Sequence, residues 1–264
     1  MDQLPVALVT GASRGIGCAI ALGLSAAGFS VAGVGRPPDN GAVRPDALAE
    51  LTREIAARGG QFLPIQMDIA DLNAHAGAID AIEHRFGRLD VFVSNAGIAP
   101  SPRRDVLDVT PESFDHLLGV NLRGSFFLAQ RAARSMLSGA TSPAGAMRTL
   151  IFVTSVSAAF SSVNRAEYCI SKAGLSMVSQ VFADRLAGEG ILVYEVRPGI
   201  VRTDMTAPVA AAYDQRIADG LVPQRRWGEP GDVARAVVAL TRGEFAYSTG
   251  MVIDVTGGLT IPRL

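Results

Sequence analysis

Short apolar runs alternate with longer amphipathic segments along almost the whole chain. The runs are rich in Val, Ile, Leu and Phe, and they are apolar throughout, which is typical of parallel strands whose two faces are both covered by helices. Seven strands are predicted, at Val6–Val9, Ser30–Val34, Phe62–Met67, Leu89–Val93, Leu150–Thr154, Leu192–Val196 and Met251–Val255.

The segments between these runs have helical periodicity. Helices are expected over Gly15–Ala27, Asp46–Arg58, Asn73–Phe86, Pro111–Leu137, Glu167–Ala187 and Pro230–Leu240. This alternation predicts an α/β protein: a single-domain, doubly wound (Rossmann) fold over residues 1–264, with a seven-stranded parallel sheet flanked by helices. Ligands of such sheets bind beyond the carboxyl ends of the strands, so functional residues are expected there.

Composition agrees with one packed core. Of 264 residues, 48% are hydrophobic and 19% are charged, which excludes a disordered chain. The net charge of −1 hides no long block of one sign, so nucleic acid and anionic membrane surfaces are not expected as partners. No apolar run approaches 18 residues and the start lacks a basic segment, so a cytoplasmic protein is expected. Cys18 and Cys169 lack metal-ligand spacing, and no metal site is predicted.

A glycine-rich turn, Thr10-Gly11-Ala12-Ser13-Arg14-Gly15-Ile16-Gly17, joins the first strand to the first helix. Gly11 allows the turn, Gly15 lets the backbone approach a pyrophosphate, and Gly17 permits close helix packing. Three residues separate the first two glycines, unlike the G-x-G-x-x-G pattern, so an ordinary tight turn is the alternative. The predicted phosphate-binding residues are Gly11, Ser13, Arg14, Gly15, Ile16 and Gly17.

The end of the second strand indicates which dinucleotide binds. NAD-binding folds place a carboxylate about 20 residues beyond the glycines, to hold the adenosine ribose. Here the strand ends Val34-Gly35-Arg36-Pro37, and Arg36 with Arg14 could instead hold a 2′-phosphate. NADP is therefore favoured, with NAD possible and a solvated loop charge as the alternative role of Arg36. Asp68, with Ile69, is placed to contact adenine or to cap a helix.

A hydroxyl, a phenol and an amine follow in a restricted spacing. Tyr168 lies thirteen residues after Ser155, and Lys172 lies four residues further, on the same helical face as Tyr168. An ammonium about 4 Å from a phenolate is worth on the order of 4 kcal/mol, enough to lower a phenol pKa of about 10 by up to about three units. Ser155 would stabilise the negative charge developing on a carbonyl oxygen. An isolated Tyr/Lys pair on a helix usually lies on the surface without a functional role. Together with Ser155 and the glycine turn, the pair predicts a nicotinamide-dependent carbonyl or alcohol oxidoreductase.

Together these motifs resemble the short-chain dehydrogenase/reductase family over essentially the whole chain. Asn121 matches the family's catalytic asparagine, and the resemblance implies a tetrad of Asn121, Ser155, Tyr168 and Lys172, with Asn121 holding a water that links Lys172 to solvent. It also implies further cofactor-binding residues: Asn95, Ala96, Gly97, Tyr168, Lys172, Pro198, Gly199, Ile200 and Thr203. Ser94 and Thr256 depart from the usual family pattern, which has Asn and Asp at these places.

The expected function is an NADP(H)-dependent oxidoreductase that interconverts a carbonyl and a secondary alcohol. The 3-oxoacyl carrier-protein reductases are the nearest likeness, so the substrate is a small molecule or an acyl thioester. An NAD-dependent sugar or polyol dehydrogenase is one alternative, and a non-catalytic dinucleotide-binding sensor with a broken tetrad is another. The resemblance also implies a homotetramer. Residues 204–227 are predicted to be a substrate lid, and Arg103-Arg104 with Arg225-Arg226 either receive an acidic substrate or carrier protein, or are merely solvated.

Overall fold

The computed structural model describes residues 4–37, 46–139 and 147–263. Its centre is a parallel sheet of seven strands in the order β3-β2-β1-β4-β5-β6-β7, which confirms the predicted fold class. The strands are β1 (Val6–Thr10), β2 (Ser30–Gly35), β3 (Phe62–Gln66), β4 (Val91–Ser94), β5 (Arg148–Val153), β6 (Ile191–Pro198) and β7 (Val252–Val255).

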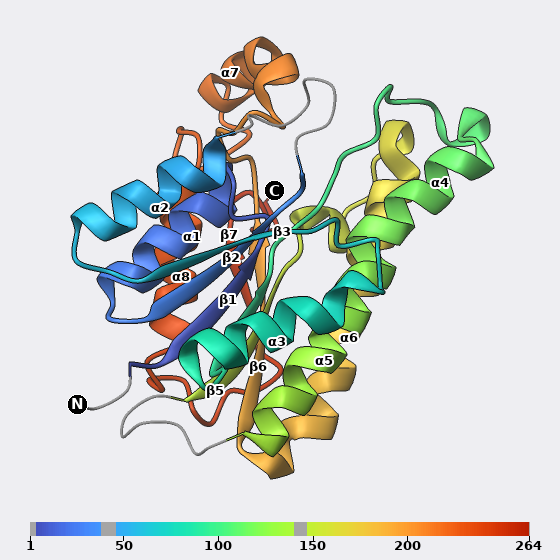
Figure 1. Ribbon diagram of the computed structural model, residues 1–264. Helices are drawn as coiled ribbons and strands as arrows, with labels where there is room; N and C mark the ends of the chain where they lie inside the picture. Colours follow the sequence, from blue (N-terminus) through green and yellow to red (C-terminus); the bar gives the residue numbers. More distant parts are fainter. Residues whose placement is uncertain (1–3, 38–45, 140–146, 264) are drawn as a thin grey trace.

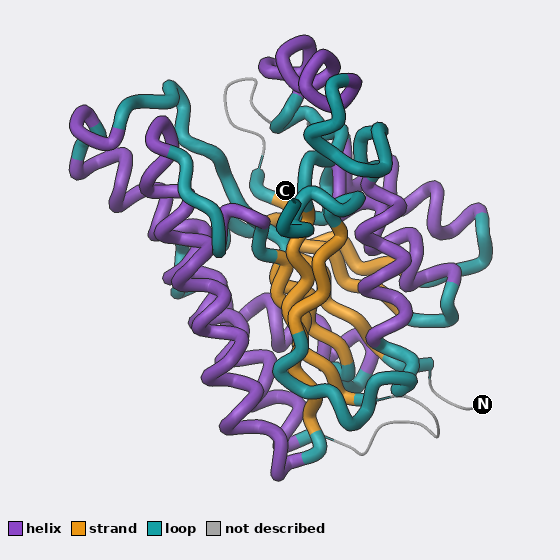
Figure 2. The backbone as a smooth tube through the Cα atoms, turned by 180° about the vertical axis from the view of Figure 1, so that it is seen from behind, coloured by secondary structure: helices purple, strands orange, loops and turns teal. Residues whose placement is uncertain are grey.

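Helices cover both faces of the sheet (Figures 1 and 2). One layer holds α1 (Gly15–Ala26), α2 (Ala47–Ala57) and α8 (Pro230–Leu240), and the other holds α3 (Ala74–Phe86), α5 (Ser125–Ser138) and α6 (Ala166–Leu186). Each layer forms its own apolar cluster with the sheet, one around Ile20 and Val237, the other around Ile82 and Leu128. Two covered faces explain why the strand sequences are apolar throughout.

The chain reverses its direction of winding between β3 and β4. Strand β1 pairs with β2 on one side and with β4 on the other. In doubly wound sheets the crevice outside the carboxyl ends of the strands at such a reversal is the usual ligand site. The glycine turn after β1 and the Asn95 segment after β4 both open into this crevice.

The predicted helix Pro111–Leu137 is interrupted. The structure has α4 (Pro111–Leu118), a π-helical turn (Gly119–Gly124) and then α5. Thr110 caps α4, as its side chain accepts a hydrogen bond from the Ser113 amide. Within the π turn, a side chain at Gly124 would collide with the Ile69 carbonyl oxygen. Apolar periodicity did not predict this turn, because a single π turn inside an α-helix is too short to have a period of its own.

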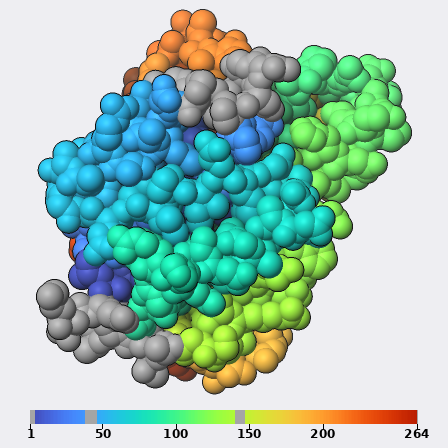
Figure 3. Space-filling view, viewed as in Figure 1, coloured from blue at the N-terminus to red at the C-terminus, as the bar shows by residue number. Residues whose placement is uncertain are grey.

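The predicted lid contains secondary structure that was not predicted. Residues 204–227 hold a short 3₁₀ turn (Ala207–Val209) and helix α7 (Ala210–Ala218), which lies at the top of the molecule in Figures 1 and 3. Ile217, Val222 and Trp227 form a small apolar cluster of their own. The Trp227 indole donates a hydrogen bond to Asp214 at 2.7 Å. This local core defines the segment as a separate unit above the sheet, and its movement stays a prediction.

Two segments rich in Gly, Pro, Ala and small polar residues, for which the sequence predicts surface loops, are Arg36 to Arg44 and Ser138 to Met147; they lie for the most part outside the described residues. Neither Cys18 nor Cys169 forms a disulfide bond. Among the helices described, none has the length and apolar character needed to cross a membrane.

Candidate active site

A cavity of about 290 Å³ opens at the carboxyl ends of the strands. Every site residue predicted from the sequence lines this cavity except Asn121, which is fully buried behind it. The cavity-lining members are Gly11, Ser13, Arg14, Gly15, Ile16, Gly17, Arg36, Asp68, Ile69, Asn95, Ala96, Gly97, Ser155, Tyr168, Lys172, Pro198, Gly199, Ile200 and Thr203. Segments from six strand ends, those of β1 to β6, therefore meet in one place.

The glycine turn forms a cradle into which a side chain would not fit. Gly11 and Gly15 have φ angles of 68° and 55°, and a side chain at Gly17 would collide with the Gly11 carbonyl oxygen. Arg14 precedes α1 without a side-chain cap, and the first turn of α1 carries no acidic residue. The first amide groups of α1 are thus left for an anion, as a dinucleotide pyrophosphate requires.

The wall beside this cradle is held by Thr10 and Asn95. The Thr10 hydroxyl accepts hydrogen bonds from the backbone amides of Asn95 and Ala96, each at 2.9 Å. The Asn95 side chain donates back to the Thr10 carbonyl oxygen at 2.9 Å. These bonds fix the segment after β4 against the turn after β1. Asp68 accepts from the Ala70 amide at 2.8 Å while α3 begins only at Ala74, so Asp68 is not the cap of that helix.

Ser155, Tyr168 and Lys172 come together from β5 and α6. Ser155 follows the end of β5, and its hydroxyl accepts a hydrogen bond from the Ser157 amide at 3.1 Å. Lys172 donates from Nζ to the Val153 carbonyl oxygen at 3.1 Å, and this nitrogen lies 5.9 Å from the centre of the Tyr168 ring. The three side chains face the same cavity.

Asn121 lies in the π turn and binds the segment after β4. Its Oδ1 accepts from the Ile98 amide at 2.8 Å, and its Nδ2 donates to the Ile98 carbonyl oxygen at 3.0 Å. A third bond joins Nδ2 to the Ser171 hydroxyl, next to Lys172. The amide of Asn121 thereby connects α6 to the cavity wall. The predicted water-holding role of Asn121 stays a prediction.

The electrostatics of Tyr168 differ from the sequence expectation. Burial raises the pKa of the Tyr168 phenol; a hydrogen bond with Ser155 and the charges of Arg165 and Arg103 act in the opposite direction. The Lys172 ammonium is directed to the Val153 carbonyl oxygen, so the predicted lowering of the phenol pKa by Lys172 stays a prediction. Burial also lowers the pKa of Lys172 to about 8, opposed by the charge of Glu195.

Glu195 was missed by the sequence analysis. It is buried in β6, where its carboxylate accepts from the Thr154 hydroxyl at 2.6 Å and from the Ser176 hydroxyl at 2.7 Å. Arg197 donates to the same carboxylate at 2.6 Å. Thr154 lies just before Ser155, and Ser176 lies one helical turn after Lys172. Glu195 thus joins the two elements that carry the reactive side chains. The available signal in the sequence was a glutamate inside an apolar strand, two residues before Arg197, because an acid in a buried strand needs a partner.

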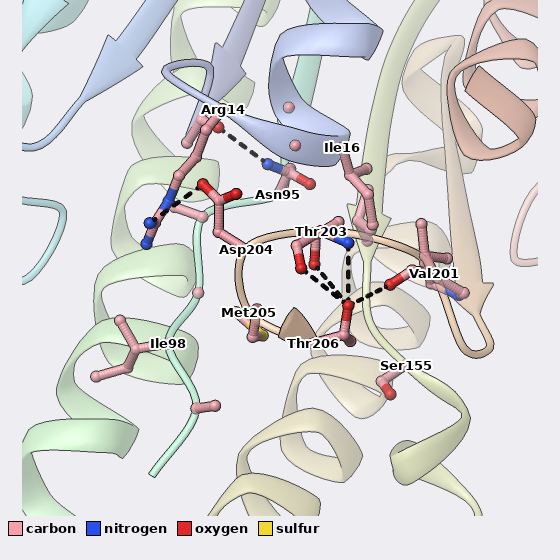
Figure 4. A pocket seen from close by; sticks show the side chains of 18 of the residues that line it. Arg14, Ile16, Asn95, Ile98, Ser155, Val201, Thr203, Asp204, Met205 and Thr206 are labelled. Atoms are coloured by element: carbon pink, nitrogen blue, oxygen red, sulfur yellow. Dashed lines mark hydrogen bonds and ion pairs between the residues drawn. The ribbon is translucent and has the colours of Figure 1, made fainter. Parts of the chain in front are cut away.

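The lid segment borders the cavity above the glycine cradle. The Asp204 carboxylate forms an ion pair with the Arg14 guanidinium, with 3.6 Å between oxygen and nitrogen (Figure 4). Both side chains are exposed. Thr206 accepts from the Thr203 amide at 3.0 Å and donates to the Val201 carbonyl oxygen at 2.8 Å, which fixes the start of the segment. Met205 and Tyr213 add apolar surface to the cavity. Among the described residues, no group of three or more His, Cys, Asp or Glu side chains is arranged to hold a metal.

The sheet, the phosphate cradle and the clustered Ser155, Tyr168 and Lys172 define a dinucleotide-dependent oxidoreductase site. The family model described as enoyl-(acyl carrier protein) reductase matches residues 11–260. The chain is 34% identical to the 3-oxoacyl-[acyl-carrier-protein] reductase FabG of Staphylococcus aureus, over 98% of this chain and 99% of the relative.

Solved structures agree with this match. A 3-oxoacyl-[acyl-carrier protein] reductase from Brucella melitensis in complex with NAD is 43% identical, with a TM-score of 0.92 and full coverage of both chains. A candidate 2-deoxy-D-gluconate 3-dehydrogenase from Agrobacterium tumefaciens with bound NADP is 30% identical, with a TM-score of 0.83 over 98% of this chain and 97% of that chain. The chain belongs to the short-chain dehydrogenase/reductase family. It is an NAD(P)-dependent oxidoreductase that interconverts a carbonyl and an alcohol, which confirms the predicted class of reaction.

Proposed function

We propose that this enzyme is an NADP(H)-dependent reductase of a 3-oxoacyl-type carbonyl compound. The observation that carries the proposal is the arrangement of Ser155, Tyr168 and Lys172 in the same cavity as the phosphate cradle. The names of the relatives that act on 3-oxoacyl thioesters, matched over the full chain, support this substrate class.

The residues present fit a bound dinucleotide. Gly11, Gly15 and Gly17 leave space for the pyrophosphate, and the uncapped start of α1 offers amide donors. When bound, the nicotinamide supplies the hydride that reduces the carbonyl carbon. The wall held by Thr10 and Asn95 fixes one side of the site.

Tyr168 donates the proton to the carbonyl oxygen in the proposed reaction. Because burial raises the pKa of its phenol, Tyr168 is protonated at neutral pH, as a proton donor in the reductive direction must be. Ser155 donates a hydrogen bond to the same oxygen and stabilises its developing negative charge. Lys172, held by the Val153 carbonyl oxygen, provides a positive charge that stabilises the phenolate left after proton transfer.

The preference for NADP rests on Arg36, which lines the cavity at the end of β2. A guanidinium there matches the geometry of a ribose 2′-phosphate. Related structures contain NAD in one case and NADP in another, so the residues at this position decide the preference for this chain.

A sugar or sugar-acid dehydrogenase is the second candidate. The similarity to the candidate 2-deoxy-D-gluconate 3-dehydrogenase favours it, because both chains match over nearly their full lengths. The presence of Asn121, Ser155, Tyr168 and Lys172 around one cavity argues against a non-catalytic sensor.

We also propose a cytoplasmic homotetramer, assembled in part through α5 and α6. Apolar side chains are exposed on these helices: Phe127, Ile170, Met177 and Val181, with exposed fractions from 37% to 56%. Exposed apolar residues on adjoining helices are typical of subunit interfaces. Analytical ultracentrifugation of the wild-type chain tests the assembly.

The decisive experiment follows NADPH and NADH consumption with 3-oxoacyl thioesters, small ketones and ketoses. We expect turnover of 3-oxoacyl compounds with NADPH, and loss of this turnover in Tyr168→Phe with cofactor binding retained. Oxidation of polyols with NAD, without reduction of any 3-oxoacyl compound, would overturn the proposal in favour of the second candidate.

A further inference from the structure

Two guanidinium groups lie beside the reactive end of the cavity. Arg103 belongs to the segment between β4 and α4, and Arg165 directly precedes α6. Both line the cavity together with Ser155 and Tyr168. The guanidinium carbon of Arg165 lies 5.6 Å from the centre of the Tyr168 ring.

Neither arginine has a carboxylate partner within ion-pair distance among the residues that the structure describes. The cavity wall contains two carboxylates, and neither compensates these charges. Asp204 pairs with Arg14 over the glycine cradle, and Asp68 follows the end of β3. The reactive end therefore has the positive charges of Arg103 and Arg165 without a carboxylate on its wall; the charge of Lys172 is opposed by that of the buried Glu195.

Like charges gathered in a partly desolvated cavity repel one another unless an anion lies between them. Arg165 is half-buried, so part of its hydration is already lost before any ligand arrives, whereas Arg103 is exposed and keeps its hydration. The chemistry of a guanidinium restricts the ligand further, because its planar donors match the two oxygens of a carboxylate or phosphate.

We propose that the carbonyl substrate carries an acid group, a carboxylate or a phosphate, that binds Arg165 and Arg103 while its carbonyl faces Tyr168. This inference rests on the proposed function and narrows its substrate class. A 3-oxo acid has its carboxylate two bonds from the carbonyl carbon, and a sugar acid or a ketose phosphate carries its charge a few bonds away. A thioester has no charge at this position. Since Arg165 lies inside the cavity, the anion is part of the small molecule and not of a carrier protein's surface.

The test compares related carbonyl substrates with and without a charged acid group. Initial rates with NADPH are measured for acetoacetate against ethyl acetoacetate and the acetoacetyl thioester, and for a ketose phosphate against the free ketose. Wild type is expected to have a higher kcat/KM for the charged member of one pair, and the pair concerned distinguishes carboxylate from phosphate. In Arg165→Gln the ratio of charged to neutral kcat/KM falls about tenfold, as expected for the loss of one charge-assisted hydrogen bond.

The ratio is the informative quantity because Arg165 also acts on Tyr168, and that effect is shared by both members of a pair. Arg104→Gln is the matched control, since Arg104 neighbours Arg103 but does not line the cavity; it should leave the ratio unchanged. A KM effect confined to the charged substrate would distinguish binding of the anion from a structural role of Arg165.

The possible outcomes separate this inference from the proposed function. Turnover of neutral esters or thioesters with no preference for the acid, and a ratio unaltered in Arg165→Gln, overturns the inference and leaves the reductase standing. An Arg165→Gln effect seen only with a substrate carried on an acidic carrier protein also overturns it. Absence of all turnover overturns the proposed function. In that case calorimetric binding of 3-hydroxybutyrate and its methyl ester to the NADP complex decides the inference, which requires tighter binding of the acid that weakens in Arg165→Gln.

Discussion

Lys172 donates a hydrogen bond from its buried ammonium group to the Val153 carbonyl oxygen at 3.1 Å. Val153 ends β5, and Ser155 follows two residues later, so this bond ties α6 to the strand that carries the hydroxyl of the site. The sheet thus fixes the position of the Lys172 side chain, and burial together with Glu195 determines the pKa of its ammonium group. Burial lowers its pKa to about 8, and Glu195 acts against this decrease.

Glu195→Gln is expected to move the alkaline limb of the kcat/KM profile to lower pH. The ammonium form of Lys172 exists below its pKa and is lost as the pH rises through that value. Since the Glu195 carboxylate raises the pKa of Lys172, removing its charge lowers that pKa further below about 8. Tyr168 lies beside Lys172 on the same helix, and Arg197 on β6 pairs with Glu195.

The measurement is the pH dependence of kcat/KM between pH 5 and pH 10. Ser176→Ala is the matched control, because it removes one hydrogen bond to Glu195 and leaves the charge; a smaller shift is expected. An alkaline limb that stays in place, or moves upward, in Glu195→Gln would contradict the electrostatic role.

Gly17→Ala is expected to weaken NADPH binding and to destabilise the fold by about 1 to 3 kcal/mol, because the added methyl group collides with the Gly11 carbonyl oxygen. Fluorescence titration with NADPH and urea unfolding measure the two effects. Gly77→Ala in α3 is the control, since no atom lies within 4 Å of the added group. Wild-type affinity in Gly17→Ala would show that the turn is not the phosphate cradle.

Arg36→Ala is expected to raise the KM for NADPH about tenfold or more and to leave the KM for NADH nearly unchanged, since the lost contact is to the 2′-phosphate. Steady-state rates with each cofactor, at a fixed carbonyl substrate, provide the measurement. Arg53→Ala, on the exposed side of α2, is the matched control and should alter neither value. An equal change for both cofactors would contradict the 2′-phosphate assignment.

Asp90→Ala is expected to destabilise the protein by about 3 to 5 kcal/mol without altering cofactor affinity, because it removes one member of a buried ion pair together with the hydrogen bonds that the pair forms. The two side chains form two hydrogen bonds at 2.8 and 2.7 Å and are nearly inaccessible to solvent. Urea unfolding gives the change in free energy. Glu54→Ala removes an exposed ion pair with Arg58 and should change stability by about 1 kcal/mol or less. Equal effects of the two substitutions would be inconsistent with this account.

Much of the fold and the site could be predicted from local sequence. The apolar runs predicted the seven strands, because a buried strand needs apolar residues on both of its faces. The glycines of the first turn, the acid-free start of α1 and the Tyr168–Lys172 spacing are likewise local features. Each depends on the chemistry of neighbouring residues, and the sequence alone was sufficient for them.

Other features depended on contacts between residues far apart in the chain. Asn121 is held by Ile98 within a π turn, Glu195 joins Thr154 to Ser176, and Arg165 and Arg103 line the same cavity as Tyr168. The hydrophobic periodicity of the sequence does not predict these long-range contacts, because they depend on how β4, β5, β6 and α6 pack together. The sequence therefore determined which chemical groups are available and the order of the elements. Only the tertiary structure decided the charge around the phenol, because electrostatic effects in a buried site depend on distance and burial and not on position along the chain.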